Sequence, residues 1–145
     1  MIREAVYEDL DGMLELYLHL HETSVPEHDD KLTKMWDKMI SNPDYHIIVK
    51  EVDGKIVSSC SCIIIPNLTH NVRPFALVEY VVTHADYRGK GYATDCLNYA
   101  REIAKRENCY KIMLMTGSKR PETLRFYENA GYSSADKTGF NQKLE

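Results

Sequence analysis

The sequence predicts an α/β fold in which helices flank a sheet, and two observations carry this prediction. Segments 45–52 and 55–65 are rich in β-branched residues and meet at Asp53-Gly54, a pair that favours a tight hairpin turn. A further apolar segment, 76–82, leads through a glycine-containing loop into a helix with one apolar face. The chain therefore combines an antiparallel hairpin with a strand–loop–helix unit.

The amino-terminal part predicts one strand and two helices. Residues 2–5 suit the strand, and apolar residues recur at helical spacing after it. A second helical stripe starts after the capping pair Asp29-Asp30 and stops at Asn42-Pro43. In order, the apolar positions of the two helices are Leu10, Met13, Leu14, Tyr17, Leu32, Met35, Trp36, Met39 and Ile40.

The carboxyl-terminal part predicts a strand, a helix and a final strand. Segment 111–116 has the composition of a short buried strand. Pro121 suits the first position of a helix and Gly131 suits the position just after its end. A last strand is expected after Gly131.

Composition predicts a single domain over residues 1–145. The 43% hydrophobic content is enough for one sizeable core, whereas two ordinary domains need a longer chain. The net charge is −4 with both signs interspersed, which argues against nucleic acid as a partner. No signal-peptide or membrane-spanning pattern is found, so a soluble, cytoplasmic protein without a membrane partner is expected.

Metal binding is not predicted. The four cysteines lack the paired spacing of a zinc site and suit reduced thiols. A polar segment between the first two helices contains potential ligands, but such a loop is more often solvated than metal-binding. Those residues are His19, His21, Glu22, His28, Asp29 and Asp30.

The loop at 88–93 has the features of an anion-binding site. Gly89 and Gly91 permit positive φ angles and close approach of a ligand to the backbone, at the start of a helix. A P-loop is excluded because His84 and Gly91 occupy the positions of its first glycine and its Ser/Thr. A dinucleotide fingerprint fails as well, since Thr94 replaces its third glycine and too little chain follows. An ordinary strand-to-helix turn is the remaining general alternative.

Two separated motifs resemble the GNAT superfamily of acyl-CoA-dependent N-acyltransferases. The pattern R-G-x-G-x-A at 88–93 resembles the pyrophosphate loop of that family. Segment 124–132, LRFYENAGY, resembles its late helix at the expected distance downstream. Shorter matches at 78–82 and 109–112 resemble glucosamine-phosphate N-acetyltransferases.

The resemblance implies a mixed, mostly antiparallel sheet with a splayed parallel strand pair that holds acyl-CoA. Pantetheine would run along 80–83 and the pyrophosphate would lie on the loop. The acetyl-CoA-binding residues implied in this way are Val81, Val82, Thr83, Arg88, Gly89, Lys90, Gly91, Tyr92, Ala93 and Thr94. Many relatives carry Asn and Ala where Arg120 and Thr123 stand, so one usual cofactor contact is lost or replaced.

Two side chains are candidate catalytic residues. Glu79 is a carboxylate within an apolar strand, which makes it a candidate base for the amine; pairing with a basic residue or exposure is the structural alternative. His84 is a weaker candidate for the same role. By resemblance, Tyr127 faces the thioester sulfur, although packing beside Phe126 is the alternative. A backbone N–H near Val81 or Val82 would hold the carbonyl oxygen.

The expected activity is acetyl transfer to a primary amine by direct attack in a ternary complex, without a metal. The acceptor is an amino sugar, an amino acid, a polyamine or an amino terminus. Lys119, Arg120 and Arg73 are candidates to meet an acidic group on it, or are solvated charges. A non-catalytic acyl-CoA-sensing module is the alternative, and the resemblance also makes a homodimer possible.

Overall fold

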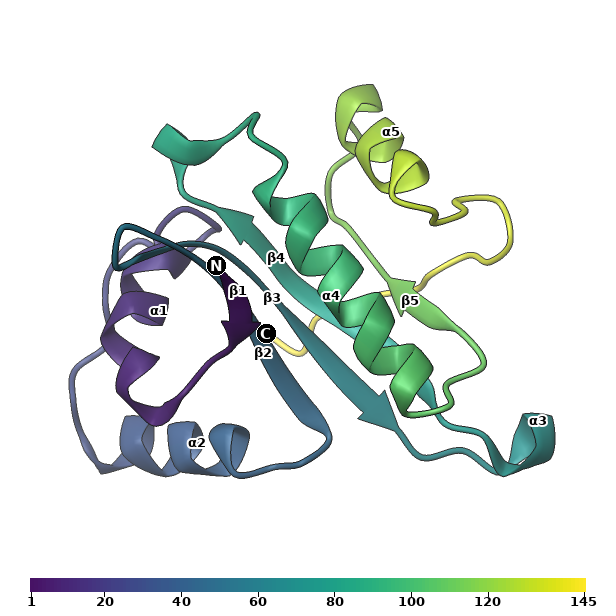
Figure 1. Ribbon diagram of the computed structural model, residues 1–145, viewed down its shortest axis with the longest axis horizontal. Coiled ribbons are helices and arrows are strands. Elements are labelled where there is room, and N and C mark those ends of the chain that lie inside the picture. Colours follow the sequence, from purple (N-terminus) through teal and green to yellow (C-terminus); the bar gives the residue numbers. More distant parts are fainter.

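The computed structural model describes residues 1–145, and its centre is a five-stranded sheet in the order β1-β2-β3-β4-β5 (Figure 1). Strands β1 to β4 pair antiparallel and β5 joins β4 in parallel, so the predicted mixed, mostly antiparallel sheet is confirmed. The strands are β1 (Ile2–Glu4), β2 (Tyr45–Val52), β3 (Lys55–Ile65), β4 (Phe75–Thr83) and β5 (Ile112–Leu114).

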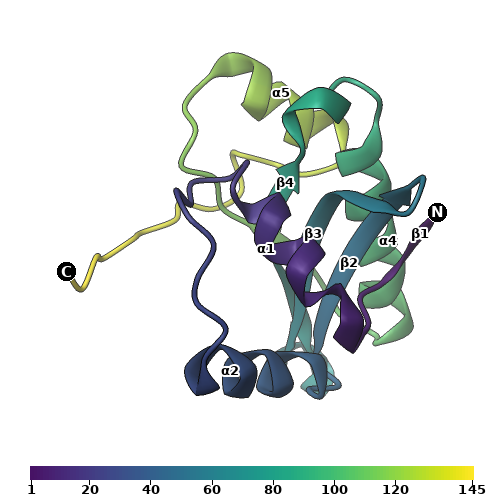
Figure 2. The ribbon, with the colours of Figure 1, turned by 90° about the vertical axis from the view of Figure 1, so that its left-hand side faces the viewer.

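Helices cover both faces of this sheet. Figure 2 shows α1 on one side and α4 on the other. No helix is long and apolar enough to span a membrane. The α-helices are α1 (Leu10–Tyr17), α2 (Asp30–Ile40), α3 (Thr69–Val72), α4 (Tyr92–Arg106) and α5 (Pro121–Asn129), and the 3-10 helices are η1 (Tyr7–Asp9) and η2 (Ala85–Tyr87).

The β2–β3 connection and the start of α2 confirm two local predictions. Asp53 and Gly54 both have positive φ angles, 50° and 77°, as a tight hairpin turn of this kind requires. Asp29 caps α2, because its Oδ1 accepts the backbone N–H of Leu32 at 2.9 Å. The buried Trp36 then donates its indole N–H to the Tyr7 carbonyl at 3.0 Å, which ties α2 to η1.

Alternation along β3 divides the core into two clusters. Cys60, Cys62 and Ile64 point toward α4 and pack with its apolar stripe. Ser59 and Ser61 point to the other face, where α1 and α2 cover the second cluster. That cluster consists of Met13, Leu16, Trp36, Ile47, Val49, Ile56 and Val82.

A β-bulge in β4 was not foreseen from the sequence. Ser61 pairs with Glu79 and Ser59 pairs with Val82, so one residue of β3 lies opposite two of β4. Tyr80 adopts a φ of 56°, which a non-glycine residue rarely does. The bulge reverses the pleat, and Val82 therefore lies in the α1-side cluster although Val78 lies in the α4-side cluster.

The end of α5 agrees with the sequence, but the final strand does not form. Gly131 has a φ of 101°, and its N–H donates to the Glu128 carbonyl at 3.0 Å. The N–H of Tyr132 donates to the Tyr127 carbonyl, which completes a Schellman motif. Residues 133–145 contain no helix or strand, so the expectation of a last strand was wrong. β5 has only three residues, and its outer edge pairs with no other strand.

Arg3 links the first strand to η1 and β2, and this contact predicts an acid-sensitive stability. Its guanidinium contacts Asp9 at 2.7 Å and Glu51 at 3.0 Å. The hydrogen bond from Arg3 lowers the pKa of Asp9, against an opposing effect of burial. A lowered folded-state pKa means stability that is present above about pH 4 and is lost as the pH falls through the folded pKa.

We therefore expect Asp9→Asn to lower the free energy of unfolding at pH 7 by ~2 kcal/mol. The difference from the unmodified protein should shrink as the pH falls from about 4 through the lowered folded-state pKa of Asp9, because below that pKa both Asp9 and the substituted Asn are uncharged. Urea unfolding at several pH values measures it, with Asp136→Asn in the exposed tail as the control. A difference that does not depend on pH would contradict this account.

Candidate functional site

The parallel pair β4 and β5 separates halfway along β4. The ladder joins Ala76 to Ile112 and ends where Val78 meets Leu114. Beyond that point, residues 79–83 of β4 pair only with β3, and the bulge at Tyr80 adds to the local bend. The splayed pair that the resemblance implied is therefore present, and it leaves one edge of β4 without a strand partner.

The loop that follows β4 presents a row of unpaired backbone donors. No backbone N–H from Arg88 to Thr94 donates to another group of the chain. Gly89 and Gly91 have φ angles of 76° and 82°, and a Cβ built on either would meet no atom within 4 Å. Gly91 caps α4 without a side-chain bond, so the helix dipole adds to the field of these donors. The loop fits an anion such as a pyrophosphate.

Arg88 fixes the loop as well as adding charge to it. Its Nε donates to the Thr83 carbonyl at 3.2 Å, and its NH2 group donates to the His19 carbonyl at 3.3 Å. These bonds join the end of β4 to the segment after α1. The loop is thus held from two sides before any ligand binds.

A pocket of about 530 Å³ lies over this loop. Every predicted cofactor residue except Lys90 lines it, together with Thr123 and Phe126 of α5. Lys90 instead holds its Nζ 5.8 Å from the centre of the Tyr87 ring. Segments 81–83 and 87–94 therefore converge on one cavity, which was the central expectation from the motif.

Glu79 lies on the α1 face of the sheet, directly opposite Ser61. Its side chain is partly buried, and no Lys, Arg or His lies within ion-pair distance. The structural alternative of a paired carboxylate therefore does not apply. Glu79 is adjacent in sequence to the bulge, close to the point where β4 and β5 separate.

His84 is engaged in a structural role. Its Nδ1 accepts the backbone N–H of Asp86 at 3.1 Å, and its ring packs against that of His19 at a tilt of 36°, with 4.0 Å between centroids. Its Nε2 lies 3.4 Å from the Nζ of Lys55. Desolvation, then His19 and Lys55, lower the pKa of His84, so an added proton is disfavoured there.

Tyr127 belongs to α5 and packs against the α4-side core. Its ring packs edge-on against Phe126 and Tyr132, at 5.1 and 6.4 Å between centroids. Burial raises the pKa of Tyr127, and Cys60 adds to the effect. Its hydroxyl donates no hydrogen bond within the chain, and its neighbour Phe126 rather than Tyr127 itself lines the pocket.

Two of the basic residues considered for the acceptor are engaged elsewhere. Arg73 donates to the carbonyls of Asn108 and Cys109, and Arg120 pairs with Glu122 at 3.0 Å. The potential ligands between α1 and α2 are also dispersed, since His28 contacts Asp11 and His21 contacts Glu22. No group of three or more His, Cys, Asp or Glu residues is arranged to hold a metal.

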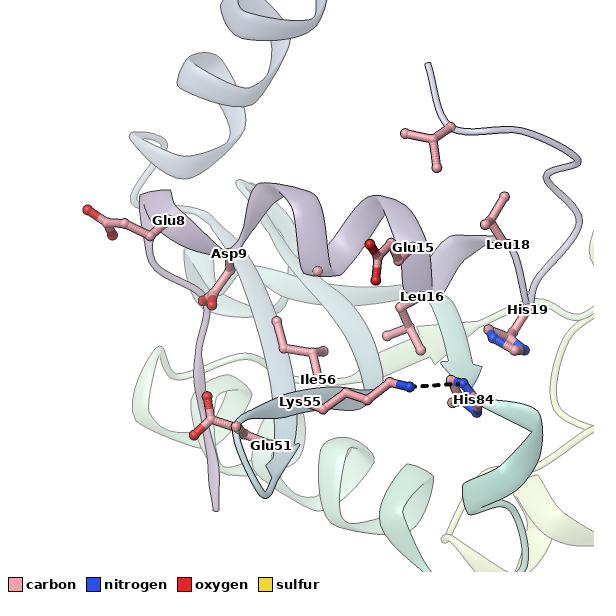
Figure 3. A pocket seen from close by; sticks show the side chains of 13 residues that line it. Glu8, Asp9, Glu15, Leu16, Leu18, His19, Glu51, Lys55, Ile56 and His84 are labelled. Atoms are coloured by element: carbon pink, nitrogen blue, oxygen red, sulfur yellow. Dashed lines mark hydrogen bonds between the residues drawn. The ribbon is translucent and has the colours of Figure 1, made fainter. Parts of the chain in front are cut away.

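A second pocket of about 880 Å³ lies between α1 and the β2–β3 turn (Figure 3). Glu8, Glu15 and Lys55 line it, and the Lys55–His84 contact marks its border. It shares His19 with the loop pocket and contains His84, the weaker candidate base, but neither Glu79 nor Tyr127 nor any predicted cofactor residue lines it.

Sequence reasoning missed two features of the site. Lys50 of β2 contacts Asp95 in the first turn of α4 at 3.1 Å, and it lies 5.2 Å from the Tyr92 ring centre. A cluster of hydroxyl groups, from tyrosines of α1 and β2 and a serine of β3, also lies beside Glu79 on the α1 face. Both bring together residues from separate helices and strands, and no local pattern signals such contacts.

Comparisons with known proteins agree with this geometry. The model of the acetyltransferase (GNAT) family matches residues 10–132. The chain therefore belongs to the GNAT family of acetyltransferases.

Individual relatives give the range of similarity. A glucosamine 6-phosphate N-acetyltransferase of Trypanosoma brucei brucei is 30% identical over 130 residues, which cover 89% of this chain and 86% of the relative. A solved structure from Agrobacterium tumefaciens str. C58 is 39% identical with a TM-score of 0.90, and 99% of each chain is covered. Another from Bacillus halodurans C-125, described as a transcriptional regulator, is 28% identical with a TM-score of 0.86 and the same coverage.

Proposed function

We propose that this chain transfers an acetyl group from acetyl-CoA to a primary amine of a small molecule. The observation that carries the proposal is the unpaired row of N–H groups from Arg88 to Thr94, next to an unpartnered edge of β4. A pyrophosphate satisfies such donors, and an amide-containing chain satisfies a strand edge. Acetyl-CoA contains a pyrophosphate followed by the amide-containing pantetheine chain, which matches the order of the loop and the strand edge.

The residues that would hold acetyl-CoA, except Lys90, all line one cavity. The loop at 88–94 would bind the pyrophosphate, and residues 81–83 would exchange hydrogen bonds with pantetheine. When bound, the cofactor supplies the activated acetyl group as a thioester. In this proposal a backbone N–H near Val81 or Val82, next to the bulge, would stabilise the carbonyl oxygen.

In this proposal Glu79 receives the proton of the amine, directly or through water. An amine with a pKa of about 10.4 is uncharged in only about one molecule in 2,500 at pH 7, equivalent to ~4.6 kcal/mol. A carboxylate without an ion-pair partner is free to accept that proton. His84 is less suited, because its Nδ1 is already occupied by the N–H of Asp86.

The first test is thiol release from acetyl-CoA with a panel of primary amines. Release that depends on one class of amine supports the enzyme. Saturable CoA binding without release for any amine would favour the sensing module. Absence of CoA binding would contradict both functions.

We expect Glu79→Gln to lower kcat about 10²- to 10³-fold, because a positioned base contributes this much to proton transfer. The KM for acetyl-CoA should not change, since Glu79 does not line the loop pocket. Initial-rate kinetics measure both constants. The matched control is Glu102→Gln, on the exposed face of α4. A kcat within about twofold of the unmodified protein would remove Glu79 from the mechanism.

A further inference from the structure

The α1 face of the sheet carries a cluster of hydroxyl groups around Glu79. Ser61 is fully buried, and its Oγ has no hydrogen-bond partner. It lies between Ile47 of β2 and Glu79 of β4 in the register of the sheet. Tyr17, at the end of α1, packs edge-on against Tyr80 with 6.3 Å between ring centres.

The sheet register shows which phenols are near this serine. Tyr45 is two residues before Ile47, which lies opposite Ser61, and Tyr17 packs against the same α1-side cluster. Burial raises the pKa of Tyr17 to about 12, and Tyr45 adds to the effect. Burial also raises the pKa of Tyr45, and the charge of Glu79 contributes. Ser61 lowers the pKa of both phenols, yet neither phenol forms a well-aligned hydrogen bond with the Ser61 hydroxyl.

The layering of these groups suggests separate roles. Ser61 has no exposed surface, whereas Tyr45 and Glu79 are only partly buried. A ligand on this face therefore meets Tyr45 and Glu79, and Ser61 lies beneath them. A buried hydroxyl without a partner is unfavourable, which favours a state in which a phenol turns onto it.

The groups that gather here also restrict the ligand. They are phenols, a serine hydroxyl and one carboxylate, and Arg73 and Arg120 are bonded elsewhere. A carboxylate suits the ammonium of an amine, and phenols suit hydroxyl groups and the faces of apolar rings. An acidic acceptor finds no cation among the residues of this cluster.

We infer that Tyr45 is an acceptor-binding residue, that Ser61 positions its hydroxyl, and that the acceptor is a small amine bearing hydroxyl groups. The inference rests on the proposed acetyl transfer and adds the class of acceptor and the residues that select it.

The probes are D-glucosamine and cyclohexylamine, two amines on six-membered rings of which only the first has hydroxyl groups. Tyr45→Phe should lower kcat/KM for glucosamine about tenfold, the loss expected for one hydrogen bond. The same substitution should leave kcat/KM for cyclohexylamine and the KM for acetyl-CoA unchanged. Comparing each variant with the unmodified protein on the same amine removes the difference in amine basicity.

Ser61 is tested through its coupling to Tyr45. Ser61→Ala should lower kcat/KM for glucosamine in the unmodified background but not in the Tyr45→Phe background, because a positioning residue acts only through its partner. Ser61→Cys, which conserves volume, should show the same coupling if the alanine variant is poorly folded. Ser59→Ala is the matched control, since this equally buried and unpartnered serine lies under α1 and opposite Val82.

The outcomes separate the two levels of the proposal. Equal losses on both amines, or additive effects of Ser61→Ala and Tyr45→Phe, would overturn the inference while leaving the acetyltransferase intact. Turnover of cyclohexylamine that exceeds that of glucosamine would overturn the acceptor class. An unmodified protein that binds CoA but acetylates no amine would overturn the proposed function and this inference with it.

Discussion

Replacing Gly89 by valine is expected to reduce the affinity for CoA at least 100-fold. Gly89 has a φ of 76°, a conformation that is genuinely unfavourable for a β-branched residue. The loop would leave the left-handed region, and its N–H groups would no longer converge on one anion. Because a hydrogen bond to a charged group is worth about 1.5–3 kcal/mol, the loss of two is enough for this effect. Titration calorimetry with CoA measures it.

The hairpin glycine provides a matched control for this substitution. Gly54 has a nearly identical φ of 77°, and a Cβ at either glycine has free space. Gly54→Val should therefore cost similar stability without weakening CoA binding. If Gly89→Val binds CoA as tightly as the unmodified protein, the loop at 88–94 is not the pyrophosphate site.

Replacing Tyr127 by phenylalanine is expected to lower kcat about 10- to 100-fold while CoA binding stays unchanged. The ring is retained, so packing against Phe126 and Tyr132 persists and only the hydroxyl is lost. A phenol of pKa about 10 facing a thiol of about 8.5 gives up its proton uphill by roughly 2 kcal/mol. Burial raises the pKa of Tyr127 further, so hydrogen-bond donation to the leaving thiolate is the expected role.

The pH dependence and a neighbouring tyrosine sharpen this test. A raised pKa keeps the phenol protonated at alkaline pH, so ionisation of Tyr127 should not reduce the rate between pH 7 and about 9.5. Tyr132→Phe is the control, because that phenol is also partly buried and its ring centre lies 6.4 Å from that of Tyr127. Equal effects of the two substitutions would assign Tyr127 to packing alone.

Local chemistry explains why much of the fold was predictable. Asp53-Gly54, Asp29 and Pro121 each act on their immediate neighbours, and all three occupy the predicted positions. The final strand failed because its formation depends on a partner elsewhere in the sheet. A strand cannot be inferred from composition when the edge available to it is as short as β5.

The site was predictable to different degrees on its two sides. Residues 81–83 and 87–94 are nearly continuous in sequence, so one motif was enough to place the loop pocket. The α1 face instead combines Tyr17, Tyr45, Ser61 and Glu79 from four separate elements. The bulge at Tyr80 changes which residues of β4 lie on the α1 face of the sheet, and this change is visible only in the pairing of β4 with β3.

The sequence by itself determined the mixed fold, the glycine-containing loop at 88–94 and membership of the acetyltransferase family, because these depend on glycines and apolar periodicity that act locally. The tertiary structure decided which titratable groups are free. In the folded chain His84, Arg73 and Arg120 form hydrogen bonds or ion pairs with neighbouring residues, whereas Glu79 has no ion-pair partner. Such choices depend on distances between residues far apart in the chain, and hydrogen bonds and ion pairs form only within a few ångströms.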